Sequence, residues 1–321
     1  MPKVREFNPH GTIDLSGKVV LITGGSAGIG KVNVRQFAEL GAKVYVVARN
    51  KEKTQAVVDE VRFKTGNKNV FFVYGELDKL ESVKAAGKAF LEKENRLHIL
   101  VCNAGTGSRT KVWTSDGFEV LFGQNYLAHV MLLRILLDCL KETANSLNNV
   151  QGCVRIVNVS SRASDFPGAP SKIDFDYLVK KGDSDSRQLP DDRKTIVIPD
   201  YSVSKLCQVL QTIKLSEVLK GTGISAYSLH PGMVQTGGYD KIYSQGGIKA
   251  LIYRALQFQM INEEDGSLTT LYCAVSNEAA NDSGLFYENC AAAVNNNKAV
   301  KDRAQIEKLW TKSFEWTESF I

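Results

Sequence analysis

Short apolar runs alternate with longer amphipathic segments through most of the chain. Residues 19–22, 43–48, 70–74 and 98–101 have the length and the apolar content of buried strands. Helical patterns follow these runs, reaching to about residue 40 and covering 51–64, 79–94 and 116–141. Strands in strict alternation with helices predict an α/β fold with a parallel, doubly wound sheet and right-handed crossovers.

The second half of the chain continues this alternation with two longer interruptions. Strands are predicted at 154–159, 224–229 and about 284–287, with helices around Tyr201 and over 263–275. We therefore predict a polar lead-in at 1–16, a single domain over 17–290 and a helical C-terminal tail at 291–321. Residues 162–200 form a polar, proline-containing insertion that is typical of a surface loop or lid. Residues 237–262 are interpreted as a mobile segment that covers the substrate, a role that an amphipathic helix could also fill.

Composition and charge narrow the possible functions. The chain has 321 residues, of which 43% are hydrophobic and 23% are charged, as is ordinary for a globular protein. Its net charge is +5, and no run of lysines and arginines predicts nucleic acid binding. Its six cysteines form no CxxC pair, so free thiols in a reducing, cytoplasmic compartment are expected. Because Arg134 and Asp138 interrupt the most apolar helical run, no transmembrane span is predicted, although peripheral membrane contact stays open.

A glycine-rich turn lies directly between the first strand and the first helix. In TGGSAGIG, residues 23–30, the glycines are Gly24, Gly28 and Gly30. A helix N-terminus presents unpaired N–H groups and partial positive charge, so a turn that lets the backbone approach closely there favours a pyrophosphate. A simple tight turn is the alternative, since this spacing departs from GxGxxG.

The end of the second strand indicates which dinucleotide would bind. NAD-selective proteins of this architecture place an acidic residue near this point, whereas an arginine can hold a 2′-phosphate. Here the acid is missing and Arg49 follows the strand, so we predict NADP(H) as the cofactor, with Lys51 and Ser26 as lesser contributors. A solvated surface arginine is the alternative interpretation.

The candidate chemistry centres on Tyr201 and Lys205, which lie one turn apart on the same helix face. A nearby ammonium favours the phenolate and lowers the pKa of a tyrosine toward the range that suits a general acid or base. Alone, this spacing is more typical of an ordinary helix. His129 is interpreted as a structural, hydrogen-bonded histidine, and no metal site is predicted.

Six motifs occur in order along the chain: TGGSAGIG, CNAG at 102–105, Asn125 in a long helix, VSS at 159–161, YSVSK at 201–205 and HPGMVQT at 230–236. Together they give the chain a resemblance to the short-chain dehydrogenase/reductase family. It extends from about residue 17 to 287. The long interval between Ser161 and Tyr201, with LCQVLQ after Lys205, is most similar to the retinol dehydrogenase and WW-domain oxidoreductase branch.

The resemblance implies a Rossmann-type sheet of about seven strands with helices on both faces, and it implies a role for each matching residue. Tyr201 would be the acid–base, Lys205 would lower its pKa and hold the nicotinamide ribose, Ser161 would bind the substrate oxygen, and Asn125 would anchor a water of the proton relay. The implied cofactor-binding residues are Gly24, Ser26, Gly28, Ile29, Gly30, Arg49, Lys51, Glu76, Leu77, Asn103, Ala104, Gly105, Tyr201, Lys205, Pro231, Gly232, Val234 and Thr236. Cys102 and Glu76 stand where asparagine and aspartate are common in the family, which puts details of adenine binding in doubt.

The expected activity is reversible hydride transfer between NADP(H) and a carbonyl or alcohol of a small apolar molecule, such as a retinoid, steroid or fatty aldehyde. Two alternatives stay open: an idle NADP(H)-binding scaffold or sensor, and a reductase of carbon–carbon double bonds that resembles protochlorophyllide reductase. The resemblance also leaves open a homodimer, because the helices around Asn125 and Tyr201 pair two subunits in many relatives.

Overall fold

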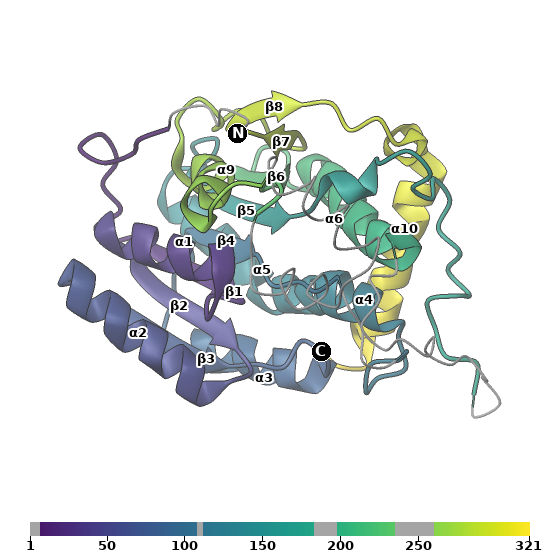
Figure 1. The fold of residues 1–321 in the computed structure, drawn as a ribbon, viewed down its shortest axis with the longest axis horizontal. Helices are drawn as coiled ribbons and strands as arrows, with labels where there is room; N and C mark the ends of the chain where they lie inside the picture. The colour runs from purple at the N-terminus through teal and green to yellow at the C-terminus, as the bar shows by residue number, and fades with distance from the viewer. Residues whose placement is uncertain (1–6, 108–111, 183–197, 235–259) are drawn as a thin grey trace.

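A single mixed sheet organises the protein, and the computed structural model describes it through residues 7–107, 112–182, 198–234 and 260–321 (Figure 1). Within these residues eight strands lie in the order β3-β2-β1-β4-β5-β6-β7-β8. Their bounds are β1 (Val19–Thr23), β2 (Lys43–Ala48), β3 (Val70–Tyr74), β4 (Ile99–Cys102), β5 (Val154–Val159), β6 (Ile224–His230), β7 (Phe286–Glu288) and β8 (Ala291–Ala293). The first seven pair in parallel, which confirms the predicted doubly wound α/β fold.

Helices cover both faces of the sheet because successive strand residues point to opposite sides. Leu21 and Leu100 belong to one buried cluster, and their neighbours Ile22 and Val101 belong to the other. The helices are α1 (Gly28–Glu39), α2 (Lys51–Thr65), α3 (Leu80–Leu91), α4 (Val120–Phe122), the π-helical turn η1 (Gly123–Leu127), α5 (Ala128–Ser146), the 3₁₀ turn η2 (Arg162–Ser164), α6 (Ile198–Val218), α9 (Glu263–Val275), the 3₁₀ turn η3 (Lys298–Lys301) and α10 (Arg303–Glu318).

The long central helix begins later than the sequence pattern predicts. Helical structure starts at Val120 and not at Asp116, and it continues to Ser146. The Asp116 carboxylate accepts a hydrogen bond from the Leu80 N–H at the start of α3, and Gly117 adopts a φ of +82°. The Glu119 side chain then caps the new start by accepting from the Phe122 N–H at 2.7 Å. Contacts with α3 therefore move the boundary by about one turn.

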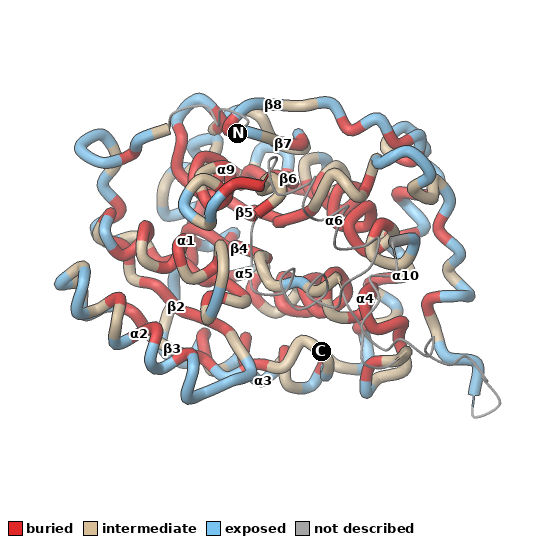
Figure 2. Tube along the Cα trace, in the orientation of Figure 1, coloured by how far each residue is buried: buried red, intermediate tan, exposed pale blue. Residues whose placement is uncertain are grey.

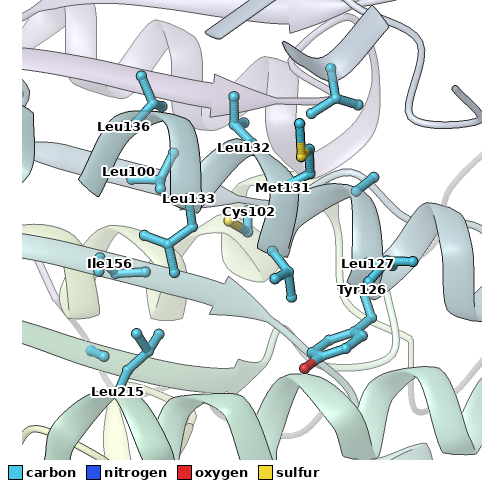
Figure 3. Close-up of a cluster of buried hydrophobic side chains, with 14 of the residues drawn as sticks. Leu100, Cys102, Tyr126, Leu127, Met131, Leu132, Leu133, Leu136, Ile156 and Leu215 are labelled. Atoms are coloured by element: carbon cyan, nitrogen blue, oxygen red, sulfur yellow. The ribbon is translucent and has the colours of Figure 1, made fainter. Parts of the chain in front are cut away.

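The same stretch, Val120–Ser146, is long and apolar enough to cross a membrane, but 78% of its most apolar window is buried inside the protein (Figure 2). Figure 3 shows Leu127, Met131 and Leu133 from this stretch gathered with Leu100 and Ile156 of the sheet. These apolar side chains therefore cover one face of the sheet.

A short antiparallel strand follows β7, where the sequence predicts the start of a helical tail. Asn289 and Cys290 both have positive φ values, 50° and 56°, as a two-residue type I′ hairpin turn requires. The chain thus reverses, and Ala291–Ala293 pairs with β7 as β8. The predicted helix begins only at Arg303. A turn of Asn and Cys lacks the glycine that usually signals such a hairpin, so the pattern did not reveal it.

The C-terminal helix α10 lies across α5 and α6 (Figure 1). Arg134 of α5 donates to the Phe314 carbonyl at 2.8 Å and to the Thr317 hydroxyl at 2.7 Å, and its guanidinium stacks over the Phe314 ring. The hydroxyls of Tyr126 in η1 and Ser313 in α10 are hydrogen-bonded at 2.9 Å. Pairing of two copies through the surfaces of α5 and α6 that contact α10 would require α10 to be displaced.

Candidate active site

The turn between β1 and α1 is built for close backbone approach. Gly24 has a φ of +71°, and a Cβ added there would lie 2.8 Å from the Cα of Ala104. A Cβ at Gly30 would lie 2.5 Å from both the Gly24 carbonyl oxygen and the Asn103 amide nitrogen. Helix α1 begins at Gly28 without a side-chain cap and without an acidic residue in its first turn. Its N–H groups and partial positive charge therefore suit an anionic group such as a pyrophosphate.

Thr23 joins this turn to the CNAG segment after β4. Its hydroxyl oxygen accepts from the N–H groups of Asn103 at 3.1 Å and Ala104 at 3.0 Å, and the Asn103 side chain donates to the Thr23 carbonyl at 2.9 Å. The carboxyl ends of β1 and β4 are thus fixed side by side. This edge of a parallel sheet is where doubly wound proteins bind dinucleotides.

Three residues predicted for the adenosine side lie near the carboxyl ends of β2 and β3. Arg49 is exposed directly after β2 and forms no ion pair with any residue in the described ranges, while Lys51 is the exposed first residue of α2. Glu76 accepts from the Tyr74 hydroxyl and pairs with Lys79 at 3.0 Å. These contacts hold the pKa of Glu76 below its usual range, so its carboxylate is already engaged within the chain.

The remaining cofactor candidates lie partly within the described residues and partly outside them. Ser26, Ile29 and Leu77 are half-buried, as are Pro231 and Gly232 after β6. Val234 is buried and pairs with Ile261 in an isolated parallel bridge, and a Cβ added to Gly266 of α9 would lie 2.3 Å from its Cγ2. Thr236 lies outside the described residues, as does the segment 237–262 apart from its last three residues.

Lys205 is the buried cation of the site. It is 3% exposed, and its Nζ donates to the Val159 carbonyl at 2.8 Å and to the Gln208 side-chain oxygen at 3.1 Å. Burial lowers the pKa of Lys205 to about 7. Its Nζ lies 5.7 Å from the centre of the half-buried Tyr201 ring. The structure therefore brings the predicted tyrosine and lysine together on one face of α6.

The two serines after β5 have different partners. Ser160 is buried, and its hydroxyl donates to the Lys205 carbonyl at 2.8 Å, which ties β5 to α6. Ser161 is half-buried, and its Oγ accepts from the Ala163 N–H at 3.1 Å. The Ser161 hydroxyl hydrogen is given to no acceptor in the described residues, so it can be donated to a substrate oxygen.

Asn125 lies in the π-helical turn and fixes the loop after β4. Its side-chain oxygen accepts from the Thr106 N–H at 2.8 Å, and its amide nitrogen donates to the Thr106 carbonyl at 2.9 Å and to the Ser204 hydroxyl at 3.0 Å. A Cβ on Gly105 would lie 3.1 Å from the Lys205 Nζ. Asn125, Gly105 and Lys205 are therefore neighbours.

Three polar residues of the site were not singled out from the sequence: Thr23, Ser204 and Gln208. His129 was, and the structure confirms it as a structural histidine: its Nε2 contacts the Thr23 hydroxyl and its Nδ1 the Asn125 carbonyl, both at 2.9 Å. Ser204 and Gln208 lie near Lys205 on the same helix, but both also bond to Asn125 in η1. Only tertiary packing reveals those contacts.

Comparison with known proteins places the chain in a family. A model of the short chain dehydrogenases matches residues 18–172. Mouse (Mus musculus) retinol dehydrogenase 12 is 32% identical over 318 residues, covering 98% of this chain and 92% of that protein. Human (Homo sapiens) retinol dehydrogenase 11 is also 32% identical, over 97% of this chain and 91% of that protein.

Among solved structures, the RhlG/NADP active-site complex of Pseudomonas aeruginosa has a TM-score of 0.64 at 20% identity, covering 87% of this chain and 96% of that chain. Similarity at this identity shows the fold alone. The two retinol dehydrogenases, in contrast, match nearly the whole chain at 32% identity. The chain therefore belongs to the short-chain dehydrogenase/reductase family, in the branch of the retinol dehydrogenases, and is an oxidoreductase that acts on CH–OH and C=O groups with a nicotinamide cofactor.

Proposed function

We propose that this protein interconverts a carbonyl and an alcohol on a small apolar substrate of retinoid, steroid or lipid type, with NADP(H) as the cofactor and Tyr201 as the acid–base. The observation that carries the proposal is the buried Lys205 ammonium, 5.7 Å from the centre of the Tyr201 ring. A cation in a site of low dielectric strongly favours a neighbouring phenolate, and this lowers the pKa of the tyrosine.

Each residue then has a distinct task. When bound, the nicotinamide ring supplies or accepts the hydride. In the reducing direction, the Ser161 hydroxyl hydrogen-bonds the substrate oxygen and Tyr201 transfers its phenolic proton to that oxygen as the C–O bond becomes single. In the oxidising direction, Tyr201 takes the proton back. A preorganised donor to a developing oxyanion contributes about 3 kcal/mol of transition-state stabilisation, and proton transfer about as much.

The central test is Tyr201→Phe, with Tyr74→Phe as the matched control because Tyr74 is exposed on β3. We expect kcat to fall by several powers of ten, roughly, in the Tyr201 variant, while NADPH affinity, measured by fluorescence titration, stays nearly unchanged. The control should keep wild-type activity. Retained turnover in Tyr201→Phe would refute the assignment. Wild-type protein that binds NADPH but oxidises none across a panel of aldehydes and ketones would support a scaffold or sensor instead.

The choice of NADP(H) is supported by Arg49, because a planar guanidinium matches the oxygens of a 2′-phosphate. The residue is exposed at the carboxyl end of β2, and no described acidic side chain competes for it. We expect Arg49→Ala to raise the KM for NADPH by about tenfold and to leave the KM for NADH nearly unchanged, a loss equal to about 1.4 kcal/mol. Lys53→Ala, an exposed change in α2, is the control. An unchanged ratio of the two KM values would remove the argument.

We infer that the two long segments between regular elements, residues 162–200 and 237–262, line the substrate side of the active site. In residues 162–200, buried Ile173 and Leu178 anchor the described part: the Ile173 N–H donates to the Gln305 side chain at 2.9 Å, and the Leu178 carbonyl accepts from the Glu119 N–H at 2.9 Å.

For the cellular location, we propose a cytoplasmic compartment, because all six cysteines are free and five of them are buried.

A further inference from the structure

The Gln208 side chain forms a bridge inside the site. It is fully buried on α6, one turn after Lys205, and its Oε1 accepts from the Lys205 Nζ at 3.1 Å. Its Nε2 donates to the main-chain carbonyl of Asn125 at 3.0 Å. One amide thus joins the lysine of α6 to the π-helical turn that precedes α5.

The direction of this amide is fixed by its neighbours. An ammonium can only donate and a carbonyl oxygen can only accept, so the glutamine oxygen must face Lys205 and its nitrogen must face Asn125. A carbonyl oxygen has two lone pairs, and the second donor to Asn125 is the His129 Nδ1–H at 2.9 Å. The resemblance to the family assigns Asn125 the anchoring of a relay water. In this chain both acceptor positions of its carbonyl already face side-chain donors.

We propose that Gln208 is a positioning residue of the active site, whose amide links the Asn125 carbonyl directly to the Lys205 ammonium and holds that ammonium beside Tyr201. The inference rests on the proposed function, because it assigns Lys205 the task of tuning Tyr201. It goes further in stating that a side chain of this protein makes the connection between Asn125 and Lys205.

The surroundings of Lys205 explain why one acceptor matters. The titratable groups that face it are Tyr201 on α6, His129 on α5 and His230 at the end of β6, and burial holds the pKa of both histidines at about 4. Because both histidines are neutral near pH 7, neither supplies a negative charge to the ammonium. Its favourable contacts are the Val159 carbonyl and the Gln208 amide oxygen. Removing one of two acceptors from a buried cation disfavours the charged form.

The test compares Gln208→Leu with Gln211→Leu. Gln211 is a second buried glutamine on the same helix, and its Oε1 has no hydrogen-bond partner in the described residues. The Lys205 Nζ donates to Val159 and Gln208 and not to Gln211. In cofactor-free protein carrying ¹³Cε-lysine, with the Lys205 signal assigned from Lys205→Met, we expect Gln208→Leu to lower the apparent pKa of Lys205 by about one unit. Gln211→Leu should leave it unchanged.

Kinetics supply the second readout. We expect Gln208→Leu to lower kcat by about tenfold or more with a smaller change in the KM for NADPH, and to move the alkaline limb of the kcat profile to lower pH. Gln208→Glu should move the pKa of Lys205 upward, since a carboxylate favours the ammonium, but should recover only part of kcat because it cannot donate to the Asn125 carbonyl.

The outcomes separate the two proposals. If the wild-type protein turns over carbonyl substrates but Gln208→Leu matches Gln211→Leu in Lys205 pKa and in kcat, the positioning role is refuted while the proposed function stands. If Tyr201→Phe keeps full activity, the proposed function fails, whatever the lysine titration shows. A Gln208→Leu variant that unfolds at lower denaturant but keeps the wild-type Lys205 pKa would show a structural role only and would also overturn the inference.

Discussion

Replacing Thr23 by valine should lower the free energy of unfolding substantially, even though the two side chains have nearly the same volume. The Thr23 side chain is fully buried, and its hydroxyl takes part in three hydrogen bonds, with His129 Nε2 and with the N–H groups of Asn103 and Ala104. Valine has nearly the same volume, so it opens no cavity, but it leaves all three partners without a bond. At about 1 kcal/mol net for each bond, the free energy of unfolding should fall by about 3 kcal/mol.

The control is Thr23→Ser, which keeps the hydroxyl and removes one methyl group at a cost of about 1 kcal/mol. Urea unfolding followed by circular dichroism gives the midpoint and the slope for both variants. If the slope is unchanged, a difference in midpoint reports a difference in the free energy of unfolding. We also expect weaker NADPH binding by the valine variant, because Thr23 fixes the segment after β4 against the glycine turn. A valine variant as stable as the serine variant would refute the hydrogen-bond argument.

Two further predictions follow from close contact and from burial. Gly30→Ala would place a Cβ 2.5 Å from the Gly24 carbonyl oxygen, so the turn must shift. NADPH affinity, measured by fluorescence titration, should therefore fall by about tenfold or more. An unchanged affinity would contradict the close packing. The His98 Nδ1 accepts from the Val19 N–H, and burial lowers the pKa of His98 to about 4. As the pH falls below 6.5, His98 is therefore protonated in the unfolded chain before it is protonated in the folded protein. Unfolding free energy should therefore drop by about 1 to 2 kcal/mol for this group between pH 6.5 and 5, and His98→Asn should abolish that part of the slope in urea titrations.

The sequence pattern predicts most of the sheet because the central strands β1, β2, β4, β5 and β6 are buried over nearly their whole length. Parallel strands covered on both faces read as continuous apolar runs, and the glycines or polar residues that end them mark the edge where ligands bind. The motif around Tyr201 and Lys205 could be found for a similar reason, since both residues lie on one helix and helical spacing alone puts them on one face.

The features that the sequence did not predict depend on partners from distant elements. The sequence pattern predicts that the central helix begins at Asp116. In the structure the Asp116 carboxylate accepts from the Leu80 N–H at the start of α3, and the central helix begins later. Gln208 lies three residues after Lys205, yet its role depends on the Asn125 carbonyl, 83 residues away along the chain. Such contacts form only when elements far apart in the sequence, such as η1 and α6, are packed together.

The completed network also limits how protons can move through the site. The His129 Nδ1 faces a carbonyl, so it carries the hydrogen, and its Nε2 accepts from the Thr23 hydroxyl. From the other side, Lys205 donates to Gln208, and Gln208 donates to the same Asn125 carbonyl. Both branches therefore donate toward Asn125, whose carbonyl has no proton to pass on. A proton from Lys205 cannot travel along this path without reversing an amide. The chain of bonds from Thr23 to Lys205 thus fixes the geometry between the glycine turn and the lysine.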